Sequence, residues 1–134
     1  MKKILGIALG CLLFSGVAWA HDGEHQGVHF VAPQDGAVVE DSVHVVMAVQ
    51  GMGVHKAGDL VQGTGHFHII VDGGFVPAGE VVAKDATHLH FGKGQVETTL
   101  KLPEGKHSLT LQLADGHHVS YGKAWSQTIQ ITVE

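Results

Sequence analysis

Short runs in which apolar and polar residues alternate follow one another along most of the chain. The clearest run is residues 42–50, where every second residue from Val43 to Val49 is apolar. This spacing places the apolar side chains on one face of a β-strand. Further strands are predicted over residues 28–31, 66–71, 88–91, 95–102, 106–114 and 127–133, with a short one near 81–82. No window keeps the 3.6-residue apolar period of a helix.

Glycine and turn residues separate these runs. The chain contains 19 glycines, and turn signals such as Pro33-Gln34-Asp35-Gly36 recur at intervals of roughly ten residues. Many short strands with frequent turns are typical of two packed antiparallel sheets. The pattern therefore predicts an all-β fold, an Ig-like antiparallel β-sandwich of about seven strands. In the predicted strand 95–102, the residues expected to face inward are Val96, Thr98, Leu100 and Leu102.

Two of the predicted strands carry the motif His-x-His. Residues 63–72 contain His66 and His68, and residues 85–92 contain His88 and His90. Because side chains alternate along a strand, the two histidines of each pair share one face and apolar residues occupy the other. Two strands that bury one face and present paired imidazoles on the other indicate a metal site, since neutral imidazole is the commonest metal ligand in proteins.

The first 20 residues have the features of a secretory signal peptide. A short basic start precedes an apolar run over residues 4–14, and Ala18-Trp19-Ala20 fits an A-x-A cleavage site. The apolar run is shorter than the roughly 20 residues of a spanning helix. We therefore predict a signal peptide (1–20), a flexible His-containing leader (21–27) and one sandwich domain (28–134). Export would place the mature protein in the periplasm, with no membrane span after cleavage.

The mature chain has an unusual composition. Cys11, the single cysteine, leaves with the signal, so neither a disulfide nor a thiolate ligand is available. The formal charge falls from −5 to −7 because Lys2 and Lys3 also leave, and the chain has no arginine. An acidic chain without arginine argues against nucleic acid as a partner. All 12 histidines lie after residue 20.

Several blocks together resemble one bacterial family. They are Gly51-Met52-Gly53-Val54, residues 63–72, residues 85–100 and residues 102–121. This combination is similar to the exported domain-of-unknown-function family numbered four-three-nine-nine. The resemblance implies a periplasmic single domain and no established activity. A second similarity, to CopC-type periplasmic copper-binding proteins, rests on His21 and on the turn at residues 33–37. It implies that the amine and imidazole of His21 chelate copper together.

An Ig-like topology suggests how the histidines come together. It makes the His66 strand an antiparallel neighbour of strand 106–115, so that the start of one lies beside His117-His118 at the end of the other. The His88 segment would flank the His66 strand on its other side. The predicted ligands of a copper or zinc ion are His66, His68, His88, His90 and His118. Asp72 and Asp85 are candidate carboxylates for orienting the rings.

Other interpretations of the same residues remain open. The histidines could be ordinary polar residues on a solvent-facing sheet surface, and the protein a non-catalytic envelope interaction domain without metal. His107 differs, since it shares the inward face of Leu109 and Leu111, and is expected to be buried and bonded to backbone. We do not expect an enzyme, because the chain has no Gly-x-Ser-x-Gly elbow and the mature chain has no cysteine. Metal binding should weaken below about pH 6, where free imidazoles take up protons.

Overall fold

The computed structural model describes residues 26–134, and in this part of the chain the regular structure is almost entirely β. The predicted signal peptide, His21 and most of the predicted leader lie outside the described residues. Seven strands have three or more residues: β1 (Gly27–Ala32), β3 (Ser42–Gln50), β5 (Thr64–Val71), β6 (His88–His90), β7 (Glu97–Lys101), β8 (Gly105–Ala114) and β9 (Ser126–Val133). Two-residue strands β2 (Val38–Val39) and β4 (Gly53–Val54) and the 3₁₀ turn η1 (Lys123–Trp125) complete the order.

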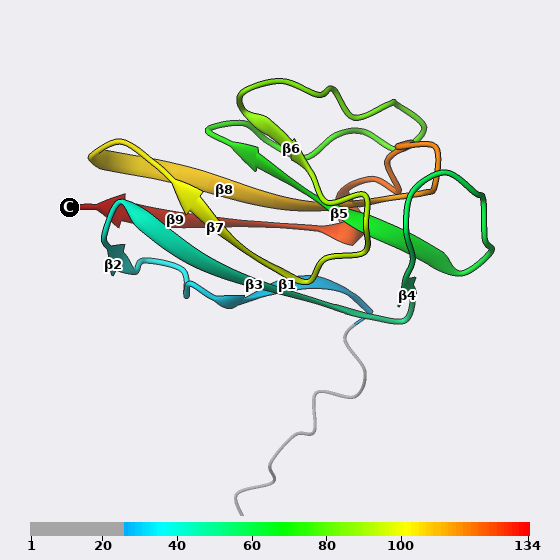
Figure 1. The fold of residues 1–134 in the computed structure, drawn as a ribbon, viewed down its shortest axis with the longest axis horizontal. Coiled ribbons are helices and arrows are strands. Elements are labelled where there is room, and N and C mark those ends of the chain that lie inside the picture. Colours follow the sequence, from blue (N-terminus) through cyan, green and yellow to red (C-terminus); the bar gives the residue numbers. More distant parts are fainter. Residues whose placement is uncertain (1–25) are drawn as a thin grey trace, which may run out of the picture.

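The strands form two sheets that pack face to face (Figure 1). The smaller sheet has the order β1-β3-β7, and the larger has the order β2-β9-β8-β5-β4, with β6 also pairing with β5. All pairs between the longer strands are antiparallel, while the two-residue strands β2 and β4 pair in parallel. The predicted all-β, Ig-like sandwich is therefore confirmed.

The core between the sheets follows the predicted alternation. Val43, Val45 and Met47 of β3 are buried against alternate residues of β8 and β9, including Leu109 and Ile129. Burial of such side chains is the main stabilising contribution in a domain of this size. The prediction is wrong for Val96, which is 46% exposed. It precedes the first residue of β7, Glu97, in the segment that leads out of the turn at residues 92–94.

The outer face of the larger sheet is covered as well. We call residues 73–84, between β5 and β6, the cover loop (Figure 1). Its backbone is attached to outward-facing side chains of β8: Thr110 donates to the Gly73 carbonyl at 3.0 Å, and the Gln112 side-chain oxygen accepts from the Val76 amide at 3.0 Å. As a result, every residue of β5 from Gly65 to Val71 is buried.

Candidate metal centre

His66 and His68 lie next to each other on the outer face of β5. Strand register pairs His66 with Ala114 and His68 with Gln112 of β8, and pairs His68 with His90 of β6 on the other side. Both histidine side chains are fully buried, with 0% exposure. For these two residues, the interpretation as polar groups on a solvent-facing surface is therefore wrong, because the cover loop and the turn after β8 shield that face.

The close approach of β5 to β8 requires glycine at position 65. A Cβ atom there would lie 2.6 Å from the Ala114 carbonyl oxygen and 2.8 Å from Leu113 Cγ. Nearby, the Tyr121 hydroxyl donates to the Thr64 carbonyl at 2.7 Å, which holds the segment after β8 against the start of β5. These contacts fix the distance between β5 and the turn that carries His118.

His118 comes from the tight turn that follows β8. Asp115 organises this turn, since its side chain accepts from the amides of His117 at 2.8 Å and Val119 at 3.0 Å. His118 itself has a φ of 64°, in the left-handed region that few non-glycine residues adopt. Its carbonyl accepts from the Val82 amide of the cover loop at 2.8 Å. Turn and loop together hold the His118 ring over β5.

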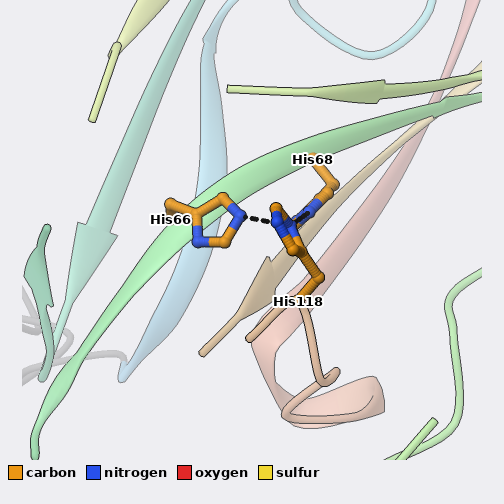
Figure 2. Close-up of side chains that lie close together, drawn as sticks. All are labelled: His66, His68 and His118. Atoms are coloured by element: carbon orange, nitrogen blue, oxygen red, sulfur yellow. Dashed lines mark hydrogen bonds between the residues drawn. The ribbon is translucent and has the colours of Figure 1, made fainter. Parts of the chain in front are cut away.

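The three rings meet at their nitrogens (Figure 2). His66 Nε2 lies 3.0 Å from His118 Nδ1, and His68 Nε2 lies 3.3 Å from the same atom. One nitrogen from each ring falls within 4.8 Å of the other two. We call His66, His68 and His118 the histidine cluster. Two nitrogens bound to one tetrahedral zinc ion at 2.0–2.1 Å would be roughly 3.3 Å apart, which is close to the two distances from His118 Nδ1.

The environment keeps the cluster uncharged. Burial lowers the pKa of His66 from 6.5 to about 4, with the neighbouring His118 and His90 adding to the effect. Burial likewise lowers the pKa of His68 to about 2, and the pKa of His118 is also lowered, again first by burial. Neutral imidazole is the form that binds metal, so these rings are already in the ligating state at neutral pH.

Two nitrogens of the cluster have no hydrogen-bond partner among residues 26–134: Nδ1 of His66 and Nδ1 of His68. The backbone of Gln112 raises the pKa of His68, but this is the smallest influence on it and does not give Nδ1 a hydrogen bond of normal geometry. Exchange of tautomers does not help, because either tautomer of the neutral ring leaves this Nδ1 without a partner, as an unmatched donor or an unmatched acceptor. An unsatisfied buried polar group costs roughly 1–3 kcal/mol. Packing alone therefore does not account for two histidines at this position.

His90 lies beside the cluster without joining it. Its ring centroid is 4.4 Å from that of His68 and 4.7 Å from that of His118, and it stacks on the latter. His90 Nε2 donates to the Ala83 carbonyl at 2.7 Å, which leaves Nδ1 as the unprotonated nitrogen of the neutral ring. A histidine held through one nitrogen in this way has the arrangement usual in metal ligands.

His88, the fifth predicted ligand, is placed apart from the others. It pairs with Ile70, two residues farther along β5 than the pairing of His90 with His68. Its Nδ1 donates to Asp85 at 2.8 Å, and this hydrogen bond is the main reason why the pKa of Asp85 is lowered to about 2. The two candidate carboxylates accept hydrogen bonds from histidines outside the cluster: Asp85 from His88, and Asp72 from His107 at 2.9 Å. His107 is mostly buried and also donates to the Pro103 carbonyl, a backbone bond of the kind expected.

A pocket of about 550 Å³ opens onto the cluster from solvent. His118 and His90 form part of its wall, whereas His66 and His68 lie behind them, fully buried. The alternation of polar and apolar residues does not predict this cover. The consecutive apolar residues Ile69, Ile70 and Val71 were the available signal, because a run without alternation is typical of a strand buried on both faces.

Comparison with known proteins identifies a family. No curated protein matches the chain. The X-ray structure of the endo-β-1,4-mannanase from Thermotoga petrophila is similar over 85% of this chain, with 17% identity and a TM-score of 0.48. The match covers 21% of the mannanase chain, so this chain spans about a fifth of its length. The family model of a domain of unknown function, DUF4399, matches residues 45–134, which include the whole histidine cluster. The chain therefore belongs to the DUF4399 family.

Proposed function

We propose that this protein binds a zinc or copper ion in the bacterial periplasm, with His66, His68 and His118 as ligands. The proposal is supported above all by one observation: a nitrogen from each of three imidazoles lies within 4.8 Å of the other two, in a largely buried site. An ion at the centre would use the lone pairs of the three facing nitrogens and replace their mutual contacts with metal–ligand bonds.

The donor set supports zinc or Cu(II) over other ions. Imidazole suits zinc and copper, whereas magnesium and calcium prefer oxygen ligands. No sulfur belongs to the cluster, and Met47 and Met52 pack in or against the apolar core. Three imidazoles with a fourth position toward the pocket fit tetrahedral zinc, and Cu(II) accepts a flatter set of nitrogens.

Residues 1–20 support the location, since they carry the basic start, apolar run and A-x-A site of a signal peptide. Cell fractionation followed by mass spectrometry of the intact protein tests this part. A periplasmic protein that begins at His21 is expected. A protein retained in the cytoplasm with residues 1–20 attached would contradict it.

Metal binding is tested with the mature protein, freed of metal by a chelator and titrated with Zn²⁺ or Cu²⁺ against a chromophoric competitor. One ion per chain is expected. His118→Asn should weaken binding by more than about 100-fold, because loss of even an outer-sphere partner of a ligand costs 10- to 100-fold. Asparagine tolerates the left-handed backbone at this position, so the turn should be retained.

His117→Asn is the matched control, since His117 belongs to the same turn and is exposed. It should bind metal like the unmodified protein. His66→Gln and His68→Gln should behave like His118→Asn. Equal binding by all of these variants, or no binding by the unmodified protein, would show that the cluster is not a metal site.

A further inference from the structure

The pocket beside the histidine cluster is lined by lysines and apolar residues, which is not the lining expected of an entrance for cations. We propose that it binds a small organic carboxylate, which completes the coordination of the ion held by the cluster. This inference rests on the proposed metal site and adds the class of its exogenous ligand. The argument uses the position of the pocket, the charges around it and the apolar part of its wall.

The pocket lies at the side of the cluster that remains open. His118, the outermost cluster histidine, is part of the pocket wall, and the other two lie behind it. Three protein ligands with one further position filled by water or another ligand are the usual arrangement at an accessible zinc site. A molecule in the pocket could therefore reach an ion in the cluster without displacing a histidine.

The charges around the pocket favour an anion. Lys84 and Lys93 line it together with the amide of Gln95, and none of the lining residues in the described part of the chain is acidic. The whole chain carries a formal charge of −5, so two lysines without a carboxylate at this opening are a local exception.

Such charges would repel an approaching cation, but they would attract an anion already drawn toward the bound ion. Carboxylates can coordinate zinc directly, at about 2.0–2.2 Å. In the sequence, Lys84 precedes β6 and Lys93 follows it. They can therefore attract a carboxylate toward the cluster from two segments of the chain.

The remaining wall favours an organic molecule over an inorganic ion. Ala57, Val81 and Val82 also line the pocket, and Val82 is almost completely buried. The volume of about 550 Å³ falls within the 300–1,000 Å³ typical of small-molecule sites. A short hydrocarbon chain attached to the carboxylate would fill apolar space that an inorganic anion would leave to water.

Cobalt(II) provides a direct test, because its visible absorption reports changes in the ligands of a zinc-type site. The mature protein loaded with Co²⁺ is titrated with acetate and with butyrate, and with azide as an inorganic anion. Both carboxylates should change the spectrum in a saturable way. Butyrate should bind more tightly than acetate, by up to about 4-fold for each additional buried CH₂ group. Azide should bind more weakly than butyrate.

The variant Lys84→Gln/Lys93→Gln should weaken the binding of both carboxylates by about 5-fold or more at low salt, since it removes two attracting charges. Its Co²⁺ affinity in carboxylate-free buffer should be unchanged or higher. Lys101→Gln/Lys106→Gln, which alters two exposed lysines outside this pocket, is the matched control and should behave like the unmodified protein.

The possible failures are distinguishable. If the unmodified protein binds no Co²⁺, Zn²⁺ or Cu²⁺, the proposed metal site is wrong and this inference falls with it. If Co²⁺ binds but neither carboxylate alters the spectrum, the metal site stands and the carboxylate site is wrong. Equal carboxylate affinity in both double variants would also overturn it, as would azide binding as tightly as butyrate.

Discussion

Lowering the pH should destabilise the metal-free protein, and the two buried histidines of β5 determine how strongly. The pKa of His66 is lowered to about 4 and that of His68 to about 2, while both rings titrate near 6.5 in the unfolded chain. Well above pH 6.5 neither state binds these protons, so stability is at its full value. Below pH 6.5 the unfolded chain binds protons that the folded protein does not bind, and the free energy of unfolding falls.

The size of the effect follows from these shifts. Each such proton costs about 1.36 kcal/mol per pH unit, so lowering the pH from well above 6.5 to about 5 costs about 2 kcal/mol for each ring. Two rings give about 4 kcal/mol, a large part of the roughly 5–15 kcal/mol that stabilises a typical domain. The lowered pKa of His118 acts in the same direction.

Urea unfolding of the chelator-treated mature protein at a series of pH values measures the slope of the free energy of unfolding against pH. His66→Gln should remove about half of the acid sensitivity that the two β5 rings cause, whatever its effect on stability at neutral pH. His44→Gln is the control, because His44 is exposed on β3, and it should leave the slope unchanged. If His66→Gln and the unmodified protein lose stability equally between about pH 7.5 and 5, the His66 ring is not buried and neutral as described.

Three further predictions concern the surroundings of the cluster. Gly65→Ala should lower the free energy of unfolding by about 1–3 kcal/mol in urea titrations, since its Cβ would collide with β8; Gly74→Ala, where a Cβ meets no atom within 4 Å, should change it little. Gln112→Leu should increase amide hydrogen exchange in the cover loop, because Gln112 accepts from Val76 and donates to backbone carbonyls; unchanged exchange would contradict its anchoring role. Asp72→Asn should lower the raised pKa of His107 in an NMR titration, since the Asp72 hydrogen bond is the main cause of that shift; an unmoved pKa would exclude this cause. The stability gained from His107 is complete below the unfolded pKa and is lost as the pH rises through the folded value, opposite to the effect of His66.

The fold was predictable from the sequence because its core depends on a local pattern. The alternation in β3 and β8 determines which side chains face inward, and the structure buries the expected ones. Strand neighbours were also predictable, since β5 lies between β8 and the His88–His90 segment as the Ig-like topology requires. Val96 shows the limit, because alternation does not reveal where the strand begins.

The site was less predictable, for two physical reasons. The cover loop is held by backbone groups, such as the Gly73 carbonyl and the Val76 amide, and contacts of this kind leave no periodic signal in the sequence. The position of His118 depends on a left-handed backbone conformation. Burial also changes the expected pH response. With the pKa of His66 and His68 lowered to about 4 and about 2, proton competition at these rings begins well below the pH 6 expected for exposed imidazoles.

One residue connects the interior of the site with the outside of the molecule. The ring of His118 contacts His66, while its carbonyl accepts from Val82 in the cover loop. Val81, the residue before Val82, is 67% exposed at the surface. An ion bound by the His118 ring would thus hold the turn, and the loop bonded to it, more firmly in place. The loaded and empty forms would then differ in how firmly this outer loop is held, so another protein could distinguish them without touching the ion.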